Sequence, residues 1–200
     1  MNPPAFSPAA ERNKAAILSA LHALLPPEGA ALEIASGTGQ HVAWFAAGLP
    51  GWTLQPSDAR RDALHSIAAH TAQAHLTNIR PPVLLDAMAA DWLPVDCRFD
   101  LIYCANMVHV APWPACAALM AGSARHLRCG GRLVTYGPYL EADVPTSSGN
   151  LAFDAALRQE NPEWGIRRRE DVEAVAAQAG LQLSQRVEMP ANNLLLVWCA

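Results

Sequence analysis

The segment from Leu32 to His41 combines the residue types that a nucleotide-like ligand requires. Its apolar start predicts a buried strand with the acid Glu33 near its end. Gly37 and Gly39 follow, and glycines let a ligand approach the backbone closely. A helix is expected from about Gln40, so that its first amides face the same place. A strand, a glycine loop and a helix N-terminus together predict a nucleotide-type binding corner.

Two common glycine motifs do not fit this segment. A dinucleotide fingerprint needs a third glycine, but Gln40, His41 and Val42 follow Gly39. A P-loop needs Gly-Lys-Ser/Thr, which is absent. What remains is Glu-x-Ala-x-Gly-x-Gly, with Ala35 in place of a first glycine. A strand–helix turn without a ligand can have the same sequence pattern, so residues elsewhere in the chain must decide whether this segment binds a nucleotide-like ligand.

Acids end the next two predicted strands. Asp58 ends the strand 52–58, at the distance from the glycine loop where an acid accepts hydrogen bonds from ribose hydroxyls. The alternative is that Asp58 caps the helix that starts near Ala59. Asp86, with Ala87, ends the strand 83–87 and could accept from an adenine amino group, with Asp91 as the competing candidate.

A fourth predicted strand, 99–105, leads into Asn106, Met107 and His109. In open α/β sheets, ligands bind outside the carboxyl ends of the strands. These three side chains are therefore expected near the reacting end of a ligand. His109 is a candidate base, because an ordinary imidazole exchanges protons near neutral pH. The alternative is a histidine packed at a helix start.

The elements that must position these residues alternate along the chain. Ser7 and Pro8 start a first helix, and the order then predicts strand–helix units repeated five times, followed by a closing hairpin. This order predicts one α/β domain over residues 1–200 with helices on both faces. The sheet is expected to have seven strands, mostly parallel, with one antiparallel strand contributed by the C-terminal hairpin. Helices are expected at 42–49, 60–74, 112–127 (ended by 129–131), 150–160 and 169–179, and further strands at 132–139, 181–189 and 193–198.

Composition excludes several classes of protein. The net charge of −4 argues against nucleic-acid partners. No apolar run is long enough to span a membrane, and no signal peptide is visible at the N-terminus. The five cysteines form no C-x-x-C pair, which favours reduced thiols in a cytoplasmic protein. Histidines 65, 70 and 75 spread around their helix, so no metal site is expected. A homodimer is compatible with the sequence, although no stretch argues for it.

The sequence resembles the methyltransferase-like protein 26 family. The matching segments include 7–13, 35–41, 55–58, 104–109, 136–139, 162–165 and 188–193. The resemblance implies a class I methyltransferase fold with S-adenosylmethionine as the cofactor, and it implies little about the acceptor. A chain without a large inserted domain favours a small-molecule acceptor. On this interpretation the cofactor residues are Glu33, Ala35, Ser36, Gly37, Thr38, Gly39, His41, Asp58, Ala59, Asp86, Ala87, Asn106 and Met107.

The acceptor side is expected to combine residues from both ends of the chain. His109 and Tyr139 are the catalytic candidates, and Arg12, Asn13, Tyr136, Asn192 and Asn193 are the substrate candidates. A solvated helix start is the alternative for Arg12 and Asn13, and turn chemistry is the alternative for Asn193. Two other functions stay open. One is a non-catalytic protein that binds S-adenosylmethionine or S-adenosylhomocysteine, and the other is a NAD-dependent oxidoreductase, which the missing glycine and the closing hairpin disfavour.

Overall fold

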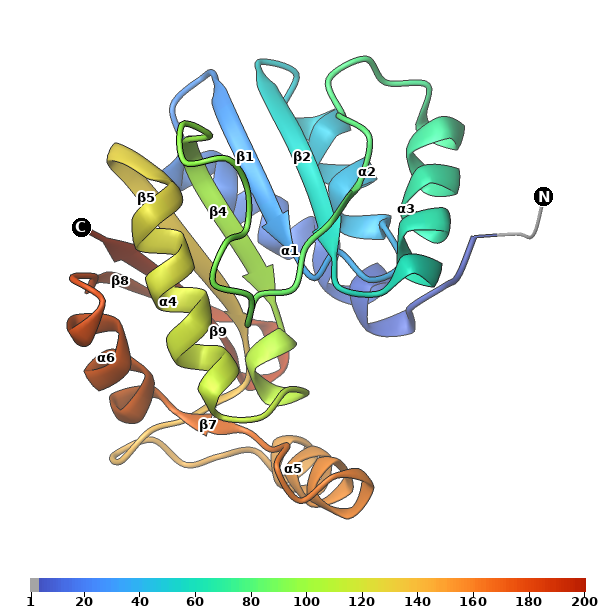
Figure 1. Ribbon diagram of the computed structural model, residues 1–200. Coiled ribbons are helices and arrows are strands. Elements are labelled where there is room, and N and C mark those ends of the chain that lie inside the picture. Colours follow the sequence, from blue (N-terminus) through green and yellow to red (C-terminus); the bar gives the residue numbers. More distant parts are fainter. Residues whose placement is uncertain (1–3) are drawn as a thin grey trace.

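The computed structural model describes residues 4–200, in which helices and strands alternate (Figure 1). Two short 3-10 turns, Met107–His109 and Pro190–Asn192, complete the elements. The helices are α1 (Pro8–Leu24), α2 (Gln40–Gly48), α3 (Arg61–Ala74), α4 (Pro114–His126), α5 (Ser148–Glu160) and α6 (Arg169–Gln178). The strands are β1 (Gly29–Ile34), β2 (Trp52–Asp58), β3 (Val83–Leu84), β4 (Phe99–Ala105), β5 (Leu127–Gly137), β6 (Tyr139–Leu140), β7 (Arg167–Arg168), β8 (Gln182–Met189) and β9 (Asn193–Cys199).

Seven strands form one sheet in the order β3-β2-β1-β4-β5-β9-β8. The first five are parallel, whereas β9 runs antiparallel to both β5 and β8. The seven-stranded sheet with a C-terminal antiparallel hairpin is therefore confirmed. The order reverses at β1, which has β2 on one side and β4 on the other. Such a switch point opens a crevice at the carboxyl ends of the strands.

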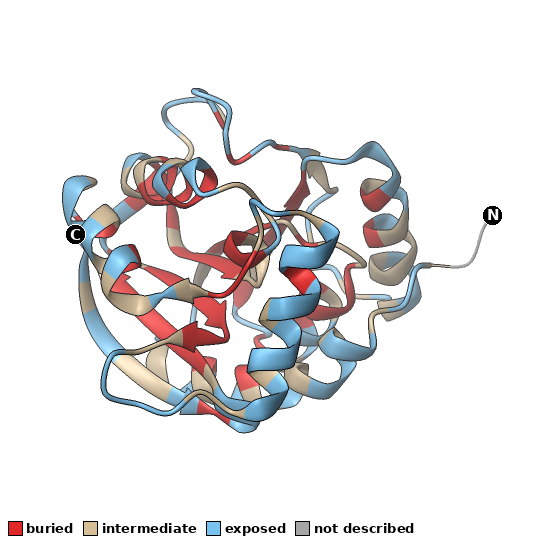
Figure 2. Cartoon of the chain, turned by 90° about the horizontal axis from the view of Figure 1, so that it is seen from below, coloured by how far each residue is buried: buried red, intermediate tan, exposed pale blue. Residues whose placement is uncertain are grey.

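Helices cover both faces of the sheet, as predicted. Helices α1, α2 and α3 lie on one face, and α4 and α6 lie on the other (Figure 1). Alternate residues of each strand pack into the hydrophobic layers on the two faces of the sheet, because successive side chains point to opposite faces. In β4, Leu101 and Tyr103 pack with the first layer, and Ile102 and Cys104 pack with the second. Figure 2 shows the buried strands enclosed between helices whose outer faces are exposed.

The start of α1 follows directly from its sequence. The Ser7 hydroxyl accepts a hydrogen bond from the Ala10 amide at 3.2 Å, and Pro8 occupies the first turn. Ile17 and Leu21, four residues apart, are fully buried against the sheet. This packing fixes α1 across the first layer, with its N-terminal turns beside the carboxyl ends of the strands.

The chain between β3 and β4 corrects one prediction. No helix forms there, so the strand–helix unit is not repeated five times. The strand expected at 83–87 is also shorter, because only Val83 and Leu84 pair with β2. The Asp86 carboxylate accepts a hydrogen bond from the Met88 amide at 2.9 Å, which turns the backbone away from the sheet. The segment after it reaches β4 as irregular chain.

The start of β5 corrects a second prediction. Residues 129–131 do not end α4, because the helix already ends at His126 and Leu127 pairs with Phe99 of β4. The pairing register then shifts between Phe99 and Leu101, opposite the stretch that contains Gly130 in the left-handed region (φ 76°). The glycines therefore shape an irregular strand start instead of a helix end. A small parallel pair, β6 with β7, was not predicted.

Candidate ligand-binding site

Two cavities open at the carboxyl ends of the parallel strands. We call the first, of about 450 Å³, the aspartate cavity, because Asp58 and Asp86 line it. We call the second, of about 560 Å³, the asparagine cavity, because four asparagines line it. Both volumes are in the range of pockets that hold small ligands. The asparagines are Asn13, Asn106, Asn150 and Asn193.

Asp58 joins the end of β2 to the glycine loop. Its Oδ2 accepts a hydrogen bond from the Gly37 amide at 2.9 Å, and its Oδ1 accepts from the Arg60 amide at 3.0 Å. The carboxylate therefore has a fixed orientation at the cavity wall. Each oxygen has further acceptor capacity, since an ionised carboxylate has about four lone-pair sites. Asp58 can therefore bind a ribose and form a hydrogen bond at the start of α3 at the same time.

Asp86 presents a free oxygen to the same cavity. Its Oδ1 accepts from the Met88 amide, and its Oδ2 has no hydrogen-bond partner among residues 4–200. Leu85, Ala87 and Met107 supply apolar surface beside it. Asp91, the competing candidate, does not line the cavity. A flat ring with an N–H donor at its edge suits an apolar slot with one free carboxylate oxygen.

The two glycines of the loop have different tasks. Gly37 (φ 59°) borders the aspartate cavity, and a Cβ placed there would meet only the Ala35 carbonyl oxygen, at 4.0 Å. Gly39 (φ 91°) lies against α3, where a Cβ would stand 2.7 Å from the Ile67 Cα. Gly37 thus gives a ligand access to the backbone, whereas Gly39 allows α2 and α3 to pack closely. Ala35 also lines the cavity, with φ 55°.

Seven of the thirteen predicted cofactor residues line the aspartate cavity: Ala35, Gly37, Asp58, Ala59, Asp86, Ala87 and Met107. Asn106 lines the asparagine cavity instead. The other five, Glu33, Ser36, Thr38, Gly39 and His41, line neither of these two cavities.

Glu33 and His41 lie behind the loop, on the face covered by α1 and α2. Burial raises the pKa of Glu33 to about 7, and its Oε2 has no hydrogen-bond partner among residues 4–200. His41 Nδ1 is 3.9 Å from Glu33 Oε1, and burial lowers the pKa of this histidine to about 4. His41 Nε2 is 2.7 Å from Asn13 Oδ1. A polar connection therefore runs from β1 through α2 to α1.

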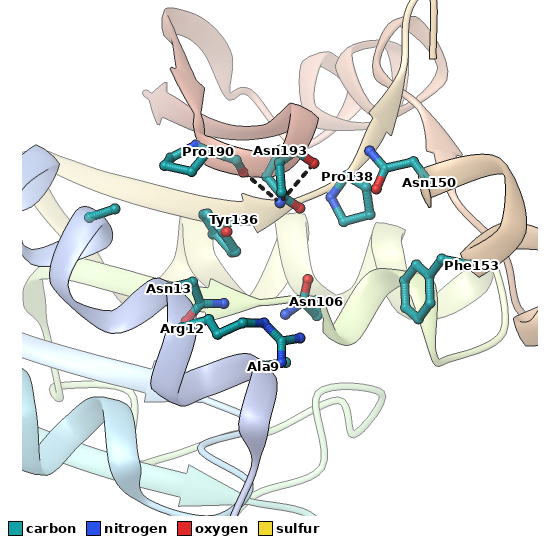
Figure 3. Close-up of a pocket in the computed structure, with 12 residues that line it drawn as sticks. Ala9, Arg12, Asn13, Asn106, Tyr136, Pro138, Asn150, Phe153, Pro190 and Asn193 are labelled. Carbon is teal, nitrogen blue, oxygen red and sulfur yellow. Dashed lines mark hydrogen bonds between the residues drawn. The ribbon is translucent and has the colours of Figure 1, made fainter. Parts of the chain in front are cut away.

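The asparagine cavity lies between segments that are far apart in sequence (Figure 3). Helix α1 contributes Arg12 and Asn13, and the ends of β4 and β5 contribute Asn106 and Tyr136. Asn193 comes from the start of β9. Four predicted substrate residues thus converge on one cavity: Arg12, Asn13, Tyr136 and Asn193.

Asn192, the fifth predicted substrate residue, does not line the cavity. It lies in the left-handed region (φ 55°), and its side-chain oxygen accepts from the Ser147 amide at 2.9 Å. Its backbone oxygen accepts from Asn150 Nδ2 at 2.8 Å. Asn192 thereby joins the β8–β9 turn to the start of α5. Asn150 and Phe153 of α5 do line the cavity, and neither was predicted as a site residue.

The two cavities meet at the end of β4. Ala105 and Met107 line the aspartate cavity, and Asn106 between them lines the asparagine cavity. Asn106 has a positive φ of 59°, which asparagine tolerates better than most residues. Its backbone amide donates to the Tyr136 carbonyl at 2.7 Å, so the β4 and β5 ends are tied together. Ligands in the two cavities would be neighbours across this residue.

His109 and Tyr139 are placed differently from the other candidates. Both are buried and neither lines the two cavities. His109 Nδ1 accepts from the Arg167 amide at 3.3 Å, and burial lowers the pKa of the ring to about 3. The Tyr139 hydroxyl donates a hydrogen bond to the Thr135 hydroxyl at 3.0 Å. The rings of His109 and Tyr139 pack edge to face. The geometry gives neither side chain contact with a molecule in either cavity.

Residues 4–200 contain neither a membrane-spanning helix nor a cluster of metal-binding side chains. No helix in that range has the length and apolar character needed to cross a bilayer. The same residues contain no group of three or more histidine, cysteine or acidic side chains suited to a metal ion.

Solved structures with the same architecture define the fold class. The apo structure of SibL, described as an S-adenosylmethionine-dependent methyltransferase, superposes with a TM-score of 0.79 at 18% identity, over 95% of this chain and 55% of that one. The SAH-bound structure of CalO1, described as a methyltransferase in calicheamicin biosynthesis, gives 0.75 at 16%, over 93% and 53%. An O-methyltransferase family 2 protein from Planctomyces limnophilus, solved with apigenin, gives 0.75 at 20%, over 94% and 61%.

The chain therefore has the Rossmann-like α/β fold of class I S-adenosylmethionine-dependent methyltransferases. It spans between 53% and 61% of the length of these three structures. Residues 4–200 match the family described as "Protein of unknown function (DUF938)", and the chain belongs to that family.

Proposed function

We propose that this protein is an S-adenosylmethionine-dependent methyltransferase that acts on a small-molecule acceptor. The observation that carries the proposal is the meeting of two cavities at Asn106, the first of them lined by Asp58 and Asp86. The fold, which the chain shares with the methyltransferase CalO1 in its SAH-bound form, supports the same cofactor. The finer resemblance to the methyltransferase-like protein 26 family, the cytoplasmic location and a homodimeric state belong to this proposal.

The residues of the aspartate cavity fit the adenosine part of the cofactor. Asp58 has oxygens with spare acceptor capacity for a ribose diol, and the free Oδ2 of Asp86 suits an amino group. Gly37 leaves space where any side chain would enter the cavity. Glu33 lies behind the loop and lines neither cavity, so we propose that its buried carboxyl group supports the loop that borders the cofactor.

Methyl transfer requires positioning more than acid–base chemistry. When bound, S-adenosylmethionine supplies a methyl group to which an acceptor lone pair bonds as the carbon–sulfur electron pair returns to sulfur. The protein must hold the acceptor atom in line with that bond and exclude water. We assign this task to Asn106 and Met107, at the junction of the cavities. Any proton that the acceptor loses passes to solvent through the open side of the asparagine cavity.

We assign His109 and Tyr139 to supporting the site, not to touching the acceptor. A histidine with a pKa of about 3 is a poor base near neutral pH. Its ring lies beneath Gly137, where a Cβ would come within 2.5 Å of Nε2. Both aromatic rings therefore hold the ends of β4 and β5 in place. The prediction that they act as catalytic groups is replaced here by a positioning role.

The first test is calorimetric titration of the purified protein with S-adenosylhomocysteine and, separately, with NAD. We expect micromolar binding of the first and none of the second. Asp58→Ala should weaken binding by about 10-fold to 100-fold, because charge-assisted hydrogen bonds are lost. Asp62→Asn, a neighbouring exposed acid, is the control and should bind normally. A folded protein that binds NAD and not S-adenosylhomocysteine would refute the proposal.

A non-catalytic cofactor-binding protein is the second candidate. Neither a carboxylate nor a histidine lines the asparagine cavity among residues 4–200, so a general base is missing there. Release of S-adenosylhomocysteine during incubation with S-adenosylmethionine and a panel of small hydroxyl, amine and thiol acceptors separates the two functions. Acceptor-dependent release favours the enzyme, whereas tight binding without release for any acceptor favours the binding protein.

A further inference from the structure

The asparagine cavity has walls of opposite polarity. Helix α1 forms one side, and the turn between β8 and β9 together with α5 forms the other (Figure 3). The ends of β4 and β5 lie between them. Because the two sides differ in charge and in hydrogen-bonding groups, they restrict the kind of molecule that can bind.

Arg12 is the charged residue that lines this cavity. Its guanidinium group points toward Asn106 in Figure 3. Its side chain has no ion pair or hydrogen bond among residues 4–200. The adjacent acid, Glu11, is already engaged, because its two oxygens pair with Lys14 at 2.5 Å and Gln40 at 2.9 Å. A positive group with five donors is thus available to a ligand, and arginine matches planar oxyanions such as carboxylates.

The opposite wall offers acceptor oxygens. Asn193 Nδ2 donates to the Pro190 carbonyl at 2.9 Å, and Asn150 Nδ2 donates to the Asn192 carbonyl at 2.8 Å (Figure 3 shows the first). Both amide groups therefore use their donors within the turn. Their side-chain oxygens have no partner in the part of the chain that the structure describes. This wall favours a ligand that carries a hydroxyl or amine donor.

Apolar rings line the cavity on the side of α5 and the β8–β9 turn and at the end of β5. Phe153, Pro138 and Pro190 line the cavity together with the ring of Tyr136. Aromatic and proline rings present faces on which a planar ligand can stack. Asn13 lines the cavity together with Tyr136, and its side-chain oxygen lies 2.7 Å from His41 Nε2. The shape and fixed orientation of these groups suit a ring better than a flexible chain.

We infer that the molecule bound in the asparagine cavity is a small aromatic acid that also carries a hydroxyl or amine group. Its anionic group pairs with Arg12, its ring lies among Phe153 and the prolines, and its donor faces Asn150 and Asn193. The statement that this molecule is the methyl acceptor rests on the proposed function. The inference that it binds in the asparagine cavity does not depend on that function. A cationic ligand would meet the guanidinium group, and a neutral ring would leave that group unpaired.

Three probes of one ring size separate the effects of charge. They are para-hydroxybenzoate, phenol and tyramine, which share the hydroxyl and differ in bearing a negative, no or a positive charge. Each is titrated into the wild-type protein by ligand-observed NMR, with and without S-adenosylhomocysteine. We expect para-hydroxybenzoate to bind about 10-fold to 100-fold more tightly than phenol, and tyramine to bind more weakly than phenol.

Variants at Arg12 connect this preference to one residue. Arg12→Gln should abolish the advantage of para-hydroxybenzoate over phenol and leave phenol binding unchanged. Arg12→Lys should keep part of the advantage, because charge remains but the planar fork is lost. Arg80→Gln is the matched control, since Arg80 is also an exposed arginine but lies outside both cavities. Circular dichroism of each variant confirms that it is folded.

Two results would overturn the inference. One is equal binding of the three probes, and the other is an unchanged preference in Arg12→Gln. If S-adenosylhomocysteine binds but no ring compound does, the acceptor class is wrong and the proposed function survives. If para-hydroxybenzoate binds through Arg12 but S-adenosylhomocysteine does not bind, the inference holds and the proposed function fails.

Discussion

Burial changes the acid–base behaviour of single residues around the site. Glu33 and Tyr103 each have a buried oxygen without a partner among residues 4–200. The pKa of Glu33 is raised to about 7 by burial, and the pKa of Tyr103 is raised by burial and by the nearby Glu33. The folded protein thus holds a proton on Glu33 that the unfolded chain releases near its ordinary pKa. Stability from this group falls as pH rises from about 4.5 to 7.

His109 has the opposite effect on stability. Its pKa in the folded protein is about 3, below its ordinary value of about 6.5. Between these values the unfolded chain binds more protons, so the free energy of unfolding decreases as pH falls below 6.5. We predict that wild-type protein loses about 2 kcal/mol more stability between pH 7 and pH 5 than the variant His109→Gln does.

Urea denaturation at the two pH values measures this difference. His41 and Glu33 titrate in both proteins, so their contributions cancel in the comparison. His65→Gln, at an exposed position on α3, is the control and should keep the wild-type loss. Equal losses in wild type and His109→Gln would show that the buried ring accepts a proton without cost.

At the scale of elements, the glycine loop performs two separable tasks. Gly37→Ala places a methyl group at the aspartate cavity with no close protein contact, and we predict about 1–2 kcal/mol of backbone strain. The affinity of the Gly37→Ala variant for S-adenosylhomocysteine should fall about tenfold or more. Gly39→Ala drives a methyl group against α3 and should cost about 2–4 kcal/mol of stability.

Thermal unfolding and calorimetric titration of both variants test the separation. The expected pattern is a larger loss of stability for Gly39→Ala and a larger loss of affinity per folded molecule for Gly37→Ala. The reverse pattern would mean that the ligand contacts the start of α2 and not the loop before it.

Local patterns in the sequence predicted the elements well but not all of their contacts. Apolar strands that end in acids were enough to place Asp58 and Asp86 at the same edge of the sheet, because parallel strands end together. The wall made by Asn150 and Phe153 was not predictable, since it depends on a hydrogen bond between α5 and a turn more than 40 residues later. The sequence left two roles open for His109, a candidate base and a packed histidine, for a similar reason: its burial depends on Gly137 and Arg167, which are distant in sequence.

At the scale of the whole molecule, β9 unites the two hydrophobic layers. Leu194, Leu196 and Trp198 pack on the side of α4 and α6, and Leu195 and Val197 pack on the side of α1 and α2. A large change on either side of this strand therefore disturbs the sheet that both layers share. Because of this shared strand, the two layers are expected to unfold in one transition.

Leu195→Ala and Trp198→Ala test that expectation from opposite sides. Both side chains are fully buried, so each variant should lose about 2–5 kcal/mol of stability. Far-ultraviolet circular dichroism and tryptophan fluorescence should give coincident urea transitions in both variants. Trp44→Ala, on the exposed side of α2, is the control and should lose less. Separate transitions for the two probes would show that the layers are independent.

The position of β9 also has a consequence for synthesis of the chain. This strand follows all the others in sequence, yet it lies between β5 and β8 in the sheet. Until β9 has left the ribosome, β5 in the nascent chain has an unpaired edge. Such an open edge can recruit strands of other molecules. Chaperone demand and aggregation should therefore be greatest between the emergence of β5 and that of β9 from the ribosome, and slow codons in that interval should lower the yield of folded protein.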